Sequence, residues 1–498
     1  MTAASPRPRL SGQTVGHLPH SVVRPAYDRM QLATGIVHLG LGAFHRAHQA
    51  VYTEQVLNAG DLRWGIAGAS LRAAETRDAL APQNGLYTVA VRDSAATHYQ
   101  VIGALTALHV APENPAALIK AMAQESVKIV SLTVTEKGYC HDPATGDLNA
   151  DHPDIRHDLA YPDQPKSALG VLLAALAQRH KAGLAPFTIL TCDNLPANGH
   201  TLHRVLQQFT RLARKDLLSF VKNEVACPST MVDRIVPSTT DADRQMVAEA
   251  LGVDDGWPIM TEPFTQWVIE DRFPHGRPDW GAYGAELVHD VLPYETMKLR
   301  LLNGSHSTLA YLGYLSGYET VAEAMADPAL AGLIEDMMAQ EITPVLSVPQ
   351  GADVAAYRRS LLARFRNTAL RHRTWQIAMD GSQKLPQRLL STIRERLAAN
   401  ASIDRLALGV AGWMRYVTGV DEQGQTIDVR DPLATELRKR ADQAGLNAEQ
   451  LAPSLLGIEA IFGKDLPNHP VFVASVTKAL GGLIEKGAKA SVSAIKRA

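Results

Sequence analysis

The sequence has little of what marks disulfide-bonded, zinc-binding or membrane proteins. Its 498 residues include three cysteines, Cys140, Cys192 and Cys227, and no C-x-x-C pair, which argues against a disulfide framework and a zinc site. No run of 18 apolar residues occurs, so we expect no membrane-spanning helix. The N-terminal stretch MTAASPRPRLSGQT lacks the apolar region of a signal peptide. We therefore expect a cytoplasmic protein without a bound metal.

An excess of charge of either sign is also missing. The 49 Lys and Arg residues are balanced by 51 Asp and Glu residues, for a net charge of −2, so no overall field attracts nucleic acid or a membrane. The hydrophobic share of 46% and the charged share of 20% are typical of a globular enzyme with a small-molecule substrate. The length predicts two or three domains.

Apolar runs typical of buried strands alternate with helical patterns over the first 290 residues. The first run, residues 35–40, precedes a helical stretch at 43–58, and β-type runs follow at 64–70, 87–92 and 99–105. The clearest are VKIVSLTV (127–134) and FTILTC (187–192), which are continuous and β-branched. Strands separated by helices predict parallel βαβ units in a doubly wound α/β domain. After residue 290 a 3.6-residue period predicts a mostly α-helical domain, so we set the domains at 1–287 and 288–498.

A glycine-containing turn follows the first strand and indicates a dinucleotide site. Gly40 permits a tight turn, Gly42 allows close approach of a pyrophosphate, and a helix begins near Ala43, although His45 stands where a third glycine is usual. The alternative is a purely structural turn. This unit predicts a Rossmann-type domain that binds NAD. The predicted cofactor-binding residues are Leu39, Gly40, Gly42, Ala43, Phe44, His45, Arg46 and Glu75.

Glu75 is the candidate for the ribose hydroxyls, but it lies 35 residues past Gly40, beyond the roughly 20 residues usual for this acid. A ribose-binding Glu75 favours NAD over NADP, whereas Arg72 and Arg77 on either side could hold a 2′-phosphate instead. All three charges could equally be solvated surface groups.

The segment 294–306 carries the predicted catalytic residues. At about 100° per residue, Glu295, Lys298, Asn303 and His306 fall within an arc of about 140° on one helix. Four such groups among Leu and Tyr residues are costly to bury unless they are paired or used. A partly desolvated lysine suits proton transfer, and an asparagine can donate to an oxyanion. The alternative is an ordinary amphipathic helix with a wet polar side.

Other polar clusters follow buried strands or lie between helices. Asn194 comes just after the strand at 187–192, and Glu136 and Lys137 come just after the strand at 127–134, so all three should face the ligand crevice of the sheet. Arg371 and Arg373 are close enough in sequence to Lys384 to share an anion pocket with it, although solvated helix arginines are the simpler interpretation.

These motifs together resemble the polyol-specific long-chain dehydrogenases, the family of mannitol 2-dehydrogenase and the hexuronate reductases. Matching stretches run from GIVHLGLGAFHRAHQAVYT (35–53) to about residue 425 and include SLTVTEKGYC, TCDNLPANG, TMVDRIVP and the specific K-x4-N-G-x-H core at 298–306. TEKGY, HRTWQIAMDGSQKLPQ and GWMRY are most similar to the fructuronate reductases, also called D-mannonate oxidoreductases. Gln376 stands where mannitol dehydrogenases have an arginine.

The resemblance implies roles for individual residues. Lys298 would be the general acid/base, Asn194 and Asn303 the oxyanion hole, and Glu295 part of a proton path to solvent. The residues implied in substrate binding are Glu136, Asp233, His306 and Lys384, with Lys137, Arg371 and Arg373 as candidate partners of a uronate carboxylate. It also implies no metal, a monomer and an active site in the cleft between the domains.

The expected activity is NAD-dependent, reversible reduction of the C5 keto group of D-fructuronate to D-mannonate. Sister activities remain open, namely mannitol 2-dehydrogenase, another polyol dehydrogenase or tagaturonate reductase. A non-catalytic NAD-binding protein is the alternative from a different class, and a protein freed from catalysis would have no reason to keep Lys298, Asn303 and His306 together.

Overall fold

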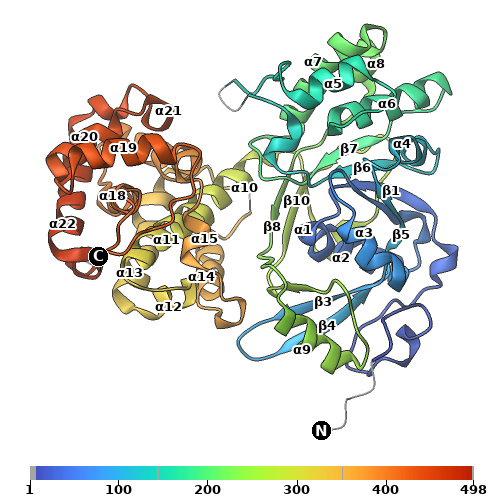
Figure 1. Ribbon diagram of the computed structural model, residues 1–498, viewed down its shortest axis with the longest axis horizontal. Helices are drawn as coiled ribbons and strands as arrows, with labels where there is room; N and C mark the ends of the chain where they lie inside the picture. The colour runs from blue at the N-terminus through green and yellow to red at the C-terminus, as the bar shows by residue number, and fades with distance from the viewer. Residues whose placement is uncertain (1–6, 143–144, 350, 496–498) are drawn as a thin grey trace. The chain divides into compact units, whose positions relative to one another are not determined.

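The computed structural model describes residues 7–142, 145–349 and 351–495. The chain divides into two compact units, residues 1–292 and residues 293–498 (Figure 1). No helix among the described residues combines the length and the apolar character that a membrane crossing requires.

A five-stranded parallel sheet forms the centre of the N-terminal unit, with the order β5-β2-β1-β6-β7. Its strands are β1 (Thr34–Leu39), β2 (Gly65–Ser70), β5 (Leu105–Val110), β6 (Ile129–Leu132) and β7 (Thr188–Thr191). Both faces are covered: Val37 and Val130 pack in one core cluster and Ile36 and Ile129 in another. Since both faces are buried, the strands are continuous apolar runs. The prediction of a doubly wound Rossmann-type domain is confirmed.

The helices of the N-terminal unit are α1 (Ala43–Ala47), α2 (Gln49–Asn58), α3 (Glu75–Leu80), α4 (Pro115–Met122), α5 (Pro153–Ala160), α6 (Ala168–Lys181), α7 (Asn198–Ala213), α8 (Leu218–Glu224) and α9 (Asp241–Leu251). Of these, α1 to α6 lie between strands of this sheet in the chain, and α7 to α9 follow its last strand. The single helix predicted over 43–58 is two helices, because His48 leaves the helical region with φ −125° and ψ −86°. Its Nε2 lies 2.9 Å from the backbone oxygen of Gln266. A contact between residues so far apart in the chain cannot be predicted from the local sequence pattern.

Two three-stranded sheets complete the unit. One has the order β4-β3-β9, from β3 (Tyr87–Arg92), β4 (Thr97–Ile102) and β9 (Ile259–Thr261). The other has the order β11-β10-β8, from β8 (Thr230–Asp233), β10 (Gln266–Glu270) and β11 (Glu286–Val288). Of these, β3 and β4 were predicted, whereas the three-to-five-residue strands β8 to β11 were not singled out.

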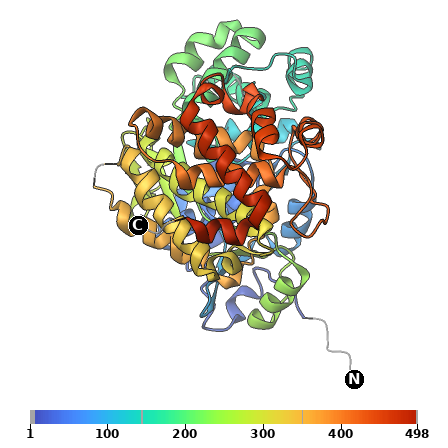
Figure 2. The ribbon, with the colours of Figure 1, turned by 90° about the vertical axis from the view of Figure 1, so that its left-hand side faces the viewer.

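The C-terminal unit is helical, as predicted, and no strand follows β11 in the described part of the chain. Its elements are α10 (Leu292–Met297), η8 (Lys298–Gly304), α11 (Ser305–Leu315), α12 (Val321–Ala326), α13 (Pro328–Asp336), η9 (Met337–Ile342), α14 (Val354–Phe365), α15 (Thr374–Ala378), α16 (Gly381–Leu385), η12 (Pro386–Leu390), α17 (Ser391–Ala398), α18 (Asp404–Tyr416), α19 (Ala434–Ala444), α20 (Ala448–Leu456), α21 (Glu459–Phe462) and α22 (Pro470–Ala494). Figure 2 shows the helices of this unit in a second view, turned by 90° about the vertical axis. The buried helix α18 packs against α11 and α22 and forms the centre of their core.

Candidate functional site

The loop after β1 has the geometry that its glycines predict. Gly40 has a φ of +92°, and a Cβ at this residue would lie 2.1 Å from the backbone oxygen of Thr133, so only glycine fits this turn. Gly42 is exposed, and a Cβ there would meet nothing closer than 3.7 Å. The loop therefore presents open backbone at the carboxyl end of β1.

A cavity of about 510 Å³ lies beside this loop. Its walls include residues 40–42 after β1, residues 70–73, 75 and 76 at the end of β2 and just after it, and residues 133–135, 137, 138 and 140 after β6. The chain places β2 and β5 on one side of β1 and β6 and β7 on the other, and open α/β sheets bind ligands at such a switch point. The cavity also has the volume usual for a bound small molecule.

The predicted cofactor-binding residues divide into two groups. Gly40, Gly42 and Glu75 line the cavity. The remaining five, which do not line it, are Leu39, Ala43, Phe44, His45 and Arg46.

Two of those five have side chains that point into the core. The ring of His45 stacks on His38 with 3.4 Å between the ring centroids, and His45 is almost completely buried. Arg46 donates to the backbone oxygen of Trp257 at 2.7 Å, and its guanidinium lies over the ring of Tyr87. These contacts attach α1 to the core of the domain.

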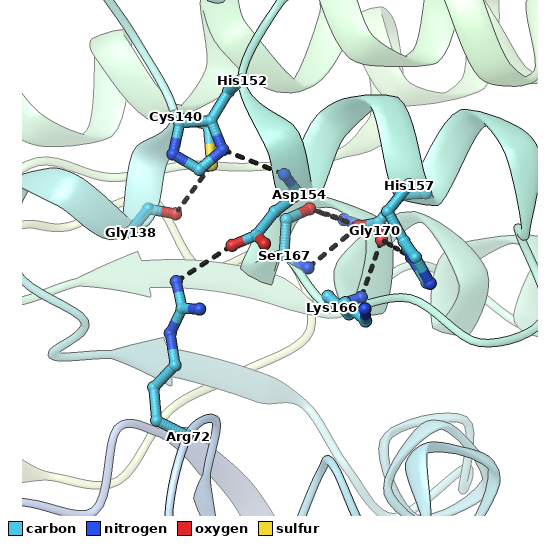
Figure 3. A network of polar contacts seen from close by, with 10 residues as sticks. Arg72, Gly138, Cys140, His152, Asp154, His157, Lys166, Ser167 and Gly170 are labelled. Atoms are coloured by element: carbon cyan, nitrogen blue, oxygen red, sulfur yellow. Dashed lines mark hydrogen bonds and ion pairs between the residues drawn. The ribbon is translucent and has the colours of Figure 1, made fainter.

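Of the two arginines on either side of Glu75, one lines the cavity and the other does not. Arg72 lines the cavity and donates to Asp154, with 3.0 Å between Nη2 and Oδ2 (Figure 3). Arg77 lies outside the cavity wall and binds Glu113 through both terminal nitrogens.

Asp193 ties together the loops that follow β6 and β7. Its carboxylate accepts from the backbone N–H of Val134 at 3.0 Å, from that of Thr135 at 2.9 Å and from the hydroxyl of Tyr139 at 2.7 Å. Burial raises the pKa of Asp193, although these donors favour its charged form. Thr135 has a φ of +63°, a conformation that costs a non-glycine residue about 1–3 kcal/mol and often occurs at functional sites. Asp193 was not among the predicted site residues.

Residues predicted to bind substrate in this unit follow three strands. Glu136 and Lys137 are exposed after β6, Asn194 is exposed after β7, and the buried Asp233 ends β8. Lys137 also lines the cavity beside Gly40. Asn198 has a structural role, since its side-chain nitrogen donates to the backbone oxygens of Asp193 and Thr230.

In the C-terminal unit the predicted catalytic segment is a helix with a π-helical centre. Glu295 lies in α10, Lys298 to Gly304 form η8, and His306 lies in the first turn of α11. Lys298 and His306 are buried, and Asn303 and Glu295 are half-buried. Single π-helical turns within α-helices occur frequently at functional sites.

The imidazole ring of His306 is buried. Its ring stacks on Phe365 at 5.3 Å and meets His372 edge-on at 4.8 Å between centroids. The Nε2 atom has no hydrogen-bond partner among the described residues. Burial, followed by the positive charges of its neighbours, lowers the pKa of His306 well below its ordinary value, and burial lowers the pKa of His372 to about 4. Both rings are therefore neutral near pH 7.

Besides His372, the positive charges that lower the pKa of His306 belong to Arg388, Arg364 and Lys384. Arg388 donates to the hydroxyl of Ser307 at 3.0 Å, and Lys384 donates to the backbone oxygens of Ile377 and Met379. Neither Arg364 nor Arg388 was among the predicted site residues, because neither belongs to a local motif.

Arg371 and Arg373 are more exposed than the cations whose charges act on His306. Both are exposed, and Arg373 lies 3.5 Å from Glu319. The backbone between them binds the segment before α12, where the N–H of Val321 donates to the oxygen of His372.

Two family models cover most of the chain. The model of the mannitol dehydrogenase Rossmann domain matches residues 34–282, and that of the mannitol dehydrogenase C-terminal domain matches residues 290–484. D-mannonate oxidoreductase of Escherichia coli is 48% identical over 95% of this chain and 98% of its own length. Mannitol dehydrogenase 2 of Saccharomyces cerevisiae is 40% identical over 98% of this chain and 97% of its own length.

A solved structure agrees with these matches. Mannitol 2-dehydrogenase of Pseudomonas fluorescens, in a ternary complex with NAD and D-mannitol, has a TM-score of 0.88 at 40% identity, covering 97% of this chain and 98% of that one. The chain therefore belongs to the mannitol dehydrogenase family of oxidoreductases, which act on CH–OH groups.

Proposed function

We propose that this chain is an NAD-dependent oxidoreductase that reversibly reduces the C5 keto group of D-fructuronate to give D-mannonate. The observation that carries the proposal is the 48% identity to D-mannonate oxidoreductase along almost the whole of both chains. The replacement of a mannitol dehydrogenase arginine by Gln376 and the cations around His306 support an acidic sugar as the substrate.

The cavity beside β1 fits the dinucleotide in volume, in its place at the switch point and in its glycine backbone. Gly40 and Gly42 would lie along the pyrophosphate, and Glu75 would accept from the ribose hydroxyls. NAD(H), when bound, supplies or accepts the hydride. A ribose-binding Glu75 together with the pairing of Arg72 to Asp154 favours NAD over NADP.

The protein's own residues would move the proton and bind the carbonyl oxygen. Lys298 would protonate the developing alkoxide during reduction and remove the same proton during oxidation. Asn194 and Asn303 would donate hydrogen bonds to that oxygen, and Glu295 would lie on the proton path. His306, Asp233, Glu136 and Lys384 would bind the sugar hydroxyls.

The substrate carboxylate needs a cation, and Arg364 and Arg388 are our candidates. The positive charges of Arg364 and Arg388 lower the pKa of the buried His306, whereas Arg371 and Arg373 are exposed. We expect Arg388→Met to raise the KM for fructuronate at least tenfold, and Arg371→Met, the matched control, to leave it nearly unchanged. Equal effects of the two substitutions would contradict this assignment.

A neutral polyol is the second candidate, because the Pseudomonas fluorescens relative was solved with D-mannitol. NADH consumption with D-fructuronate and D-fructose at matched concentrations separates the two. Turnover of fructuronate with little turnover of fructose supports the proposal, and a preference for fructose would make this chain a polyol dehydrogenase.

The role of Lys298 has its own test. We expect Lys298→Ala to lower kcat by about 10²–10⁴-fold with nearly unchanged NADH affinity, because the lysine would act on the substrate oxygen. Lys120→Ala, on an exposed lysine of α4, serves as the control. A loss confined to KM would remove Lys298 from the chemistry.

A further inference from the structure

An arginine and an aspartate face each other across the wall of the candidate cofactor cavity. Arg72 follows β2, and Asp154 is in the first turn of α5, more than 80 residues further along the chain. Their Nη2 and Oδ2 atoms lie 3.0 Å apart, and both residues line the cavity together with Gly40 and Gly42. Figure 3 shows Arg72 extending from its loop towards the Asp154 carboxylate.

The position of Arg72 bears on whether the cavity accepts NAD or NADP. In Rossmann-type domains the residues just after the second strand meet the adenine ribose, where an acid accepts from the 2′-hydroxyl or an arginine accommodates a 2′-phosphate. Here β2 ends at Ser70 and is followed by Leu71 and Arg72, so the arginine lies where a 2′-phosphate would bind. The first acid after β2 is Glu75.

Asp154 compensates the charge of Arg72. The aspartate side chain is 16% exposed and the arginine side chain is 72% exposed, so the carboxylate is the fixed partner and the guanidinium the mobile one. The backbone N–H of Asp154 donates to Nδ1 of His152 at 3.2 Å, which orders the turn that carries the carboxylate. An exposed ion pair contributes little stability, so little is lost when Arg72 changes partner.

The other charges near this wall do not replace Arg72. Arg77 is bound to Glu113 outside the cavity. Lys137 and Lys166 line the cavity from the segments after β6 and before α6, and Glu75 lines it beside Arg72. A 2′-phosphate in this cavity would therefore meet two lysines and two carboxylates besides Arg72, and of these groups Asp154 is the one that pairs with the Arg72 guanidinium.

We propose that Asp154 determines the cofactor preference of this chain by holding Arg72. With the pair intact, the wall favours a free 2′-hydroxyl and hence NADH. Without the Asp154 charge, Arg72 binds a 2′-phosphate and NADPH is accepted. This inference rests on the proposed function, because it requires a dinucleotide in the cavity.

Direct binding of NADH and NADPH, measured by titration calorimetry without substrate, tests the inference. We expect wild type to prefer NADH, and Asp154→Asn to bind NADPH at least tenfold more tightly than wild type with NADH affinity changed less than threefold. The gain should disappear in the double variant Asp154→Asn/Arg72→Ala. Asp154→Ala provides a second variant with the same expectation if the amide perturbs the turn.

Glu113→Gln is the matched control, since it removes one of the two carboxylate partners of Arg77, which does not line the cavity, and it should leave both affinities unchanged. Wild type that binds NADH while Asp154→Asn gains no NADPH affinity, or a gain that survives Arg72→Ala, would overturn the inference and leave the proposed function standing. Wild type that binds neither dinucleotide would overturn both.

Discussion

Replacing Gly40 by alanine tests whether the loop after β1 is fixed by the strand beside it. At a φ of +92° an L-residue is strained by roughly 1–3 kcal/mol. The added Cβ would also lie 2.1 Å from the oxygen and 2.7 Å from the carbon of the Thr133 carbonyl. That group is backbone just past β6 and cannot rotate away, and overpacking of this kind costs roughly 1–3 kcal/mol.

The two costs together predict a loss of about 2–6 kcal/mol for Gly40→Ala, a large part of the 5–15 kcal/mol usual for a folded protein. Gly42→Ala is the control: its φ is −94° and its Cβ would have no close neighbour, so we expect a loss below about 1 kcal/mol. Urea unfolding followed by tryptophan fluorescence measures the free energy of unfolding of both variants. The signal reports on the N-terminal unit because Trp64, Trp257, Trp267 and Trp280 lie in it. Equal midpoints for the two variants would refute the argument.

Three further substitutions test buried carboxylates. Asp193→Asn should cost about 1–3 kcal/mol in urea unfolding, because its amide N–H₂ faces hydrogen-bond donors; unchanged stability would contradict this. Burial raises the pKa of Glu54 from 4.5 to about 7, so the folded state binds this proton more tightly and the free energy of unfolding falls as pH rises through that window, by at most about 1.4 kcal/mol per pH unit. Glu54→Gln should therefore gain stability relative to wild type between pH 5 and pH 8, and parallel profiles would argue against it. Glu341 accepts from the backbone N–H groups of Arg405 and Leu406 at the start of α18, so Glu341→Ala should cost about 3–5 kcal/mol, whereas a thermal midpoint like that of wild type would disprove its role.

Four strands of the parallel sheet, β1, β2, β6 and β7, could be predicted because their burial leaves apolar runs in the sequence, whereas the partly exposed strand β5 was not singled out. The runs 127–134 and 187–192 contain β6 and β7, each four residues long. The strands β9 and β11 have three residues each, too few for an alternation to be recognised. They form because other strands provide hydrogen-bond partners: β9 pairs with β3, about 170 residues earlier in the chain, and β11 pairs with β10.

The surroundings of His306 include cations to which proximity in sequence did not point. Arg371 and Arg373 were grouped with Lys384 because they lie within 13 residues of it, and Arg373 lies 3.5 Å from Glu319. The cations that act on His306 include Arg364 from α14 and Arg388 from η12. Such a set forms through helix packing, and neither spacing nor periodicity encodes it.

The π-helical segment bears most directly on the proposed chemistry. In an α-helix, residues five apart are separated by about 140° around the axis, so Lys298 and Asn303 would lie at opposite limits of the predicted arc. A π-helix bonds residue i to residue i+5, which brings those two positions nearly one above the other. Lys298 to Gly304 is π-helical, so the amine and the amide project from neighbouring positions on one side. In the proposed reaction one oxygen would then receive both the proton of Lys298 and a hydrogen bond from Asn303, whereas an unbroken α-helix would place the two groups further apart around its axis.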